Sequence, residues 1–149
     1  MNSSYDLIAS VQPAEELRAQ ARQELRQCNA LSRPYGLQLS EEDILELVEA
    51  REQALNDSGR LEFGGGVLPR LLRAIVSSPW LEQDGYATTL AELQEAFYYY
   101  KSEAQDFYSD EELIEFICRA FNGPAQGSAD YVRSTSLDEL SRRAREGKL

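Results

Sequence analysis

The chain has 149 residues, of which 42% are hydrophobic and 28% charged, and its formal net charge is −11. A domain of about 150 residues buries roughly 70% of the surface that its unfolded chain exposes, so one domain can form a core without disulfides or metals. The acidic charge repels phosphate backbones and disfavours nucleic-acid binding, and the absence of histidine excludes Ser-His and Cys-His nucleophile pairs and most zinc sites.

The N-terminal residues 1–12 carry no basic signal-peptide start, and no segment approaches the ~20 apolar residues of a membrane span. We therefore expect a cytoplasmic protein that does not enter a membrane. Residues 1–12 are expected to be poorly ordered or loosely packed, residues 13–146 to form a single helical domain, and residues 147–149 to be a tail. Cys28 and Cys118 fall at apolar helical positions outside any Cys-x-x-Cys motif, which predicts buried free thiols in preference to a disulfide.

The first two predicted helices are amphipathic. The first begins at Pro13, which suits a first helical turn, and repeats apolar residues at Leu17, Ala21 and Leu25. The second begins at Ser40 with three acids in its first turn, where they complement the helix dipole. This helix is predicted to end in the turn at residues 56–59.

Residues 54–65 resemble an EF-hand calcium loop in their middle. Four residues fit its ligand and turn positions: Asn56, Ser58, Gly59 and Glu62. The two ends of such a loop need carboxylates, but Ala54 and Gly65 stand at those positions. Because Asn, Asp, Ser and Gly also favour helix ends, we interpret residues 56–59 as a helix terminator and predict no metal site.

Further helices follow in the second half of the chain. A short apolar helix is predicted over residues 67–76, ahead of Pro79. Three capping boxes predict the starts of the next three helices: Thr89–Glu92, Ser109–Glu112 and Ser136–Glu139. The helix after Ser109 is predicted to end at residues 122–124, and the segment up to Ser136 to be a loop with one helical turn after Ser128. These elements predict an all-α, single-domain orthogonal bundle of five or six helices, with a short extended or hairpin-like excursion at residues 60–63.

Charge is unevenly distributed along the chain. Between residues 82 and 115 there are ten acids and one base, Lys101. Arginines form two groups, one in the first helix and one at the C-terminus: Arg18, Arg22 and Arg26, and Arg142, Arg143 and Arg145. We expect these arginines to pair with the acidic middle of the same fold in preference to an acidic partner.

A glycine run precedes the third predicted helix. Free backbone N–H groups and the positive end of the helix dipole can hold an anion there, with two arginines near in sequence. The candidate anion-binding residues are Gly64, Gly65, Gly66, Arg60 and Arg70. The run lacks the Lys-Ser/Thr of a P-loop and the spacing of a dinucleotide fingerprint. The alternative is that the glycines permit a tight backbone where Phe63 enters the core, with Glu62, if buried, paired to Arg60 or Arg70.

Three motifs carry a resemblance to a known family. They are Gly59 to Gly66 (GRLEFGGG), Glu95 to Lys101 (EAFYYYK) and Ser109 to Glu115 (SDEELIE). From about Tyr35 to Leu140 the chain resembles a family of small bacterial proteins of unknown function, found mostly in Gram-positive, largely anaerobic species. The resemblance implies no activity, and the N-terminal helix and the basic tail lie outside it or at its margin.

The helix that contains EAFYYYK has a clear core stripe. At 100° per residue, one face carries the residues Leu90, Leu93, Phe97, Tyr100 and Ala104. That face does not account for Tyr98 or Tyr99, which either cover a second layer or face water. Because tyrosine is favoured at interfaces, we predict an interface at Tyr98, Tyr99 and Glu95.

The sequence therefore predicts a non-catalytic cytoplasmic module for protein interaction or regulation, whose partner is another protein or a second copy. The alternative is a small-molecule or anion-binding domain that uses the turn at residues 64–66. A third class, a helix-turn-helix DNA-binding protein, is disfavoured by the acidic middle helices. We expect no cofactor. Two carboxylate pairs at i, i+4 spacing, Asp106 with Asp110 and Glu111 with Glu115, can hold Mg²⁺ or Ca²⁺ but are more typical of a solvated helix start.

Overall fold

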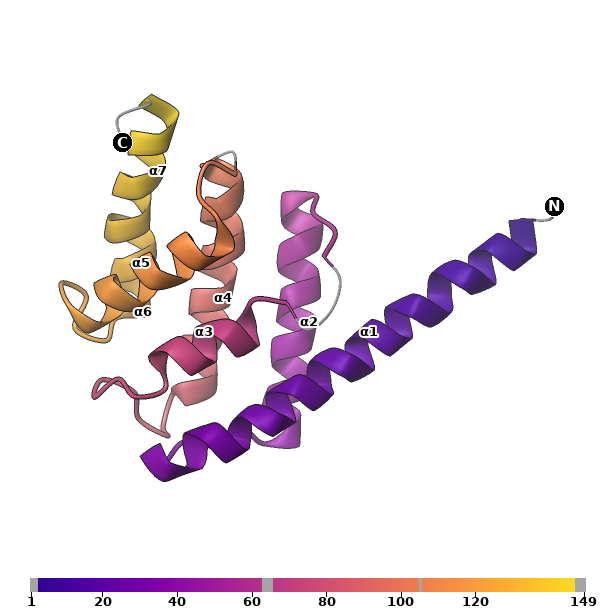
Figure 1. Cartoon of the computed structure of the whole chain (residues 1–149), viewed down its shortest axis with the longest axis horizontal. Helices are drawn as coiled ribbons and strands as arrows, with labels where there is room; N and C mark the ends of the chain where they lie inside the picture. The colour runs from indigo at the N-terminus through magenta and orange to yellow at the C-terminus, as the bar shows by residue number, and fades with distance from the viewer. Residues whose placement is uncertain (1–2, 63–65, 105, 147–149) are drawn as a thin grey trace.

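A computed structural model of the chain describes residues 3–62, 66–104 and 106–146, with side chains from residue 15 onward. Within these ranges every regular element is helical, and the predicted all-α fold is confirmed. The elements are α1 (Ser3–Ser32), η1 (Arg33–Tyr35), α2 (Glu41–Ser58), α3 (Leu68–Ile75), α4 (Tyr86–Glu103), α5 (Asp110–Asn122), α6 (Ala129–Tyr131), η2 (Val132–Ser136) and α7 (Leu137–Glu146). In Figure 1, α2 and α4 lie side by side, and α1 and α3 cross them at steep angles.

Helix α4 lies at the centre of the bundle. Its predicted core stripe is confirmed, since Leu90, Leu93 and Phe97 are fully buried and Tyr100 and Ala104 are nearly so. The helix packs most extensively on α2 and also contacts α5 and α7. Because neighbours cover it on several sides, its buried surface is wider than one amphipathic stripe.

The structure confirms the helix ends that rest on local side-chain chemistry. Ser109 and Glu112 form the predicted reciprocal capping box at the start of α5. Gly59 adopts the left-handed conformation, with φ of 67°, and ends α2 as predicted. Ser128 caps the short helix α6 by accepting a hydrogen bond from the Tyr131 backbone N–H.

Two of the three helix starts predicted from capping boxes are wrong. Helix α4 begins at Tyr86 after Gly85, so Thr89 lies inside the helix and not at its cap. Tyr86 is 1% exposed, and the burial of its ring explains why helix α4 extends beyond the local signal. Ser136 does not cap α7, because it is the last residue of the π-helical turn Val132–Ser136. This turn belongs to a helical run that begins at Ala129, so most of the predicted loop is helical.

Helix α1 begins at Ser3, ten residues before the predicted start at Pro13. Its N-terminal half extends away from the other helices in Figure 1.

Within the described ranges, no helix combines the length and the apolar character needed to cross a membrane. Both cysteines are free, as predicted; Cys28 is buried and Cys118 is partly buried.

The segment after α2 contains no strand in its described part, Arg60 to Glu62, so the hairpin-like excursion is not found there. Phe63 lies outside the described residues. Two of the three arginines of the α1 stripe pair within the fold, but with acids on α2 and not in residues 82–115. Arg18 contacts Glu52 at 2.6 Å and Arg26 contacts Glu41 at 2.8 Å. Of the C-terminal arginines, Arg145 reaches that acidic region, where its Nη1 lies 3.9 Å from Glu103 Oε2.

Candidate functional site

A groove lies between the C-terminal turns of α2 and α4. It has a volume of about 330 Å³ and is lined by Ala54, Asp57, Ser58, Glu95, Tyr99, Ser102 and Glu103. Two of the predicted interface residues, Tyr99 and Glu95, therefore lie together in one concave surface. We call this surface the α2–α4 groove.

Helix geometry brings these side chains together. Glu95, Tyr99 and Glu103 are four residues apart, so they project from the same face of α4. On the other wall, Gly59 ends α2 and leaves Asp57 and Ser58 in its last turn. The groove thus follows from the i, i+4 spacing on α4 and from the helix terminator at Gly59.

The α2–α4 groove is acidic. Asp57, Glu95 and Glu103 line it and no lysine or arginine does. The C-terminal end of α2 adds its negative dipole. Among the described residues Glu95 makes no ion pair, whereas Asp57 accepts a hydrogen bond from Gln53 at 2.8 Å. The surface therefore favours a cationic or hydrogen-bond-donating ligand.

Tyr99 presents an oriented aromatic ring to the groove. It is 54% exposed, the highest value among the described aromatic residues of α4. Its ring packs edge-on against Tyr100, with centroids 4.8 Å apart. A hydrogen bond to the Glu103 carboxylate raises the pKa of the Tyr99 hydroxyl, since a neighbouring negative charge disfavours the phenolate.

Tyr98 is not an interface residue, and this part of the prediction is wrong. The side chain is 1% exposed, and Gln94 on the same side of α4 is equally buried and donates a hydrogen bond to the Leu47 carbonyl of α2. The face that carries Gln94 and Tyr98 is covered by α2 and by the segment before α3. Tyr98 thus belongs to the second layer that the sequence left open.

The Tyr98 hydroxyl is part of a buried polar network. It donates a hydrogen bond to Glu62 Oε1, and the Arg51 Nη2 lies 3.0 Å from the same oxygen. The Val67 backbone N–H lies 3.4 Å from the Tyr98 hydroxyl. Burial and the neighbouring Glu62 carboxylate raise the pKa of Tyr98. The network fastens the segment before α3 to both α2 and α4.

Arg51 is the partner that the sequence analysis missed. We expected Glu62, if buried, to pair with Arg60 or Arg70. It is 24% exposed and pairs with Arg51, whose side chain is 8% exposed. Arg51 follows Ile44, Leu47 and Val48 on the buried stripe of α2. An arginine in an apolar stripe signals a buried charge that needs a carboxylate, and this signal was available in the sequence.

The two arginines proposed to hold an anion are engaged elsewhere. Arg60 contacts Ser102 and Asp106, and Arg70 pairs with Asp110 at 3.1 Å and with Glu111 at 2.8 Å. The structure therefore does not bring Arg60 and Arg70 together as a phosphate-binding pair. Carboxylates already neutralise both side chains.

The described glycine of the run has a structural role. Gly66 has φ of 80°, and a Cβ there would lie 2.5 Å from Arg51 Nε and 2.8 Å from Glu62 Oε1. Only glycine fits this close approach without strain. Gly64 and Gly65 lie outside the described residues.

Ion pairs also fix the start of α5. Lys101 lies 2.7 Å from Asp110. Burial alone would raise the pKa of Asp110, but hydrogen bonds from Lys101 and Arg70 outweigh it and lower that pKa. Asp106 is not free to share a metal with Asp110, because it pairs with Arg60. Among the described residues, no three Cys, Asp or Glu side chains are grouped as a metal site would require.

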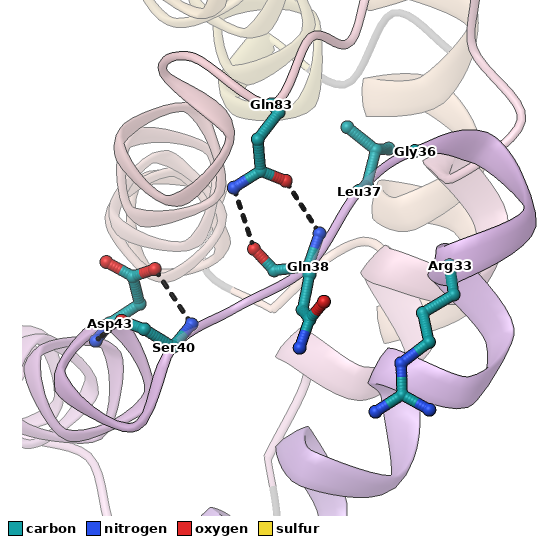
Figure 2. Close-up of a pocket in the computed structure, with 7 residues that line it drawn as sticks. All are labelled: Arg33, Gly36, Leu37, Gln38, Ser40, Asp43 and Gln83. Carbon is teal, nitrogen blue, oxygen red and sulfur yellow. Dashed lines mark hydrogen bonds between the residues drawn. The ribbon is translucent and has the colours of Figure 1, made fainter.

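A second hollow, of about 450 Å³, lies beside the connection between α1 and α2 (Figure 2). The Gln83 carboxamide faces the Gln38 backbone, accepting from its N–H at 2.7 Å and donating to its carbonyl at 3.0 Å. Asp43 accepts from the Ser40 N–H in the capping box of α2. These polar groups satisfy backbone partners, so this hollow is a structural joint between two loops.

The fold and the groove define a small all-α domain with an acidic concave surface beside the exposed ring of Tyr99. The chain belongs to a family of unknown function (DUF6323), whose model matches residues 24–149. This match is longer than the expected range and includes part of α1 and the basic C-terminal residues. No curated protein and no solved structure matches the chain.

Proposed function

We propose that this chain is a non-catalytic cytoplasmic module that binds another protein through the α2–α4 groove. The observation that carries the proposal is Tyr99, which is 54% exposed on the wall of a concave acidic surface. Tyrosine is enriched at protein interfaces because it combines a rigid apolar ring with a hydrogen-bonding hydroxyl.

The neighbours of Tyr99 support this role. Tyr98 and Tyr100 are 1% and 8% exposed, so their rings contribute to the core, whereas the exposed ring of Tyr99 has no comparable packing role. Its contacts with Tyr100 and Glu103 restrict the ring before any partner arrives. An oriented side chain loses less conformational entropy on binding, which favours affinity.

The other candidate functions have weaker support. The anion-binding alternative at residues 64–66 loses its two proposed cations, because Arg60 and Arg70 are paired with carboxylates. The net charge of −11 disfavours a nucleic-acid partner. Free thiols at Cys28 and Cys118 are consistent with a reducing compartment.

Affinity capture from lysate of the native host tests the proposal. Tagged wild-type chain is compared with Tyr99→Ala and with Tyr35→Ala, since Tyr35 is equally exposed at 54% on η1. We expect a protein that co-purifies with the wild type and with Tyr35→Ala, and is reduced at least tenfold with Tyr99→Ala. Equal capture by all three folded chains would refute the proposed surface.

A further inference from the structure

Large apolar side chains are exposed in the loops that follow the two groove helices. Leu61 is 92% exposed and Phe107 is 56% exposed, and both exceed the 54% of Tyr99 in the groove wall. Leu61 follows α2, and Phe107 follows α4. Each therefore lies in a loop that begins where one of the two groove helices ends.

Arg60 joins these two loops to the groove. Its Nε lies 2.9 Å from Ser102 Oγ, and Ser102 lines the groove. Its Nη2 pairs with Asp106 in the loop after α4. Leu61 is the chain neighbour of Arg60, and Phe107 is the chain neighbour of Asp106. The Arg60–Asp106 ion pair thus joins the loop that carries Leu61 to the loop that carries Phe107, and Arg60 links both loops to the groove residue Ser102. Leu61 also lines a hollow between α1 and α2.

The second loop is fixed by a further contact. Lys101 Nζ donates to the Tyr108 carbonyl at 3.1 Å, and the Phe107 and Tyr108 rings pack edge-on with centroids 5.3 Å apart. The Asp106 backbone N–H donates to the Lys101 carbonyl at 3.1 Å, so Phe107 is exposed on a loop that is hydrogen-bonded to α4 through both of its chain neighbours. Its exposure creates an apolar surface on a loop that Arg60 links to the groove residue Ser102.

Among its described basic residues, the chain's own basic helix, α7, reaches the groove only through Arg145, whose Nη1 lies 3.9 Å from Glu103 Oε2. Arg142 pairs with Glu139 and Glu146, and Arg143 lies 3.5 Å from Glu139. Most of the positive charge of α7 is thus neutralised locally. A different protein with unpaired basic side chains fits the acidic groove better than a second copy does.

Building on the function proposed above, we propose that the partner is a protein that presents a basic amphipathic helix. Its apolar side chains cover Leu61, Tyr99 and Phe107, and its lysines or arginines lie against the carboxylates of Glu95 and Asp57. Helices that dock in a groove use apolar residues at i, i+3 and i+4 spacing, with charged residues at the flanks. Charge complementarity between the groove and these flanks sets the orientation of the helix.

Three synthetic peptides test the partner's chemistry by fluorescence anisotropy at physiological salt. The first is a labelled leucine-lysine peptide of about 18 residues, or roughly five helical turns, with all its leucines on one face. The second has the same composition in an order that removes the apolar face, and the third replaces lysine with glutamate. We expect the first peptide to bind, the second to bind at least tenfold more weakly, and the third not to bind.

Matched variants of the full chain localise the binding. Glu95→Gln and the double variant Leu61→Ser/Phe107→Ser should each weaken binding of the first peptide at least fivefold. Glu46→Gln, an exposed acid near the start of α2, and Tyr35→Ser should change it less than twofold. Because all of these side chains are exposed, circular dichroism should show equal helicity, and only variants that pass this check are compared.

Several results would overturn the inference. Equal losses in the Glu46→Gln and Glu95→Gln variants would show binding to net charge alone. A dimer in sedimentation velocity that Tyr99→Ala dissociates would make the second copy the occupant. If a captured host protein depends on Tyr99 while the peptides do not distinguish the variants, the proposed function stands and the basic amphipathic helix is wrong.

Discussion

Removing the hydroxyl of Tyr98 should destabilise the fold, although the substitution Tyr98→Phe keeps the ring. The hydroxyl donates to the Glu62 carboxylate and lies near the Val67 N–H, which belongs to a fully buried residue. A hydrogen bond to a charged group contributes about 1.5–3 kcal/mol to stability. The Glu62 side chain is 24% exposed and Arg51 still pairs with it, so water and Arg51 replace part of this bond. We therefore expect a loss of about 2 kcal/mol in the free energy of unfolding.

Tyr99→Phe is the matched control, because it removes the same atom from the next residue, where the hydroxyl is accessible to water. A surface change of this kind stays within about 0.5 kcal/mol. Urea unfolding followed by circular dichroism at a helical wavelength measures both variants, and thermal melts should show Tyr98→Phe lower by about 4–8 °C. Equal stabilities for the two variants would refute the buried network.

Three other predictions concern stability. Gly59→Ala should lower the free energy of unfolding by about 1 kcal/mol, and Gly66→Ala should lower it further, because both glycines have positive φ but only a Cβ at Gly66 meets Arg51. Urea midpoints that rank the two variants the other way would contradict this. The pKa of Asp110 is lowered from 3.8 in the folded state, so its carboxylate stabilises the fold above that pH and this contribution is lost as pH falls through the folded pKa. Acid titration of the unfolding free energy should therefore be steeper for the wild type than for Asp110→Asn, and parallel curves would argue against the ion pairs. Millimolar calcium should leave the melting temperature unchanged if residues 56–62 only end a helix, whereas an EDTA-reversible rise of several degrees would establish a metal site.

The sequence predicted those parts of the fold that depend on residues close in the chain. The start and end of α5 follow from the Ser109 capping box and from Gly123 and Pro124, and the end of α2 follows from Gly59. These signals act through backbone groups within four residues, so one sequence suffices to find them. The start of α4 is different, because the buried contacts of Tyr86 extend the helix past the local capping signal at Thr89.

The candidate site was predicted only in part for a related reason. The helical period separates Tyr98 and Tyr99 from the core stripe but does not indicate which of them a second layer covers. Whether Tyr98 or Tyr99 is covered depends on α2 and on the ion pair between Arg51 and Glu62, which are 11 positions apart in the sequence. Tyr98, which bonds to this pair, lies 36 positions after Glu62. Asp57 likewise could not be predicted as a site residue, because it lines the groove only through the packing of the end of α2 beside α4. Long-range packing, which local patterns do not encode, therefore determines the walls of the groove.

Photo-crosslinking at position 99 determines whether the α2–α4 groove binds another protein in the cell. A benzophenone amino acid replaces Tyr99 in one chain and the equally exposed Tyr35 in another, and both chains are irradiated in living host cells. We expect a covalent adduct with one other protein from position 99 and none with that protein from position 35. Strong crosslinking from position 35 with none from position 99 would show that the α2–α4 groove is not the binding surface.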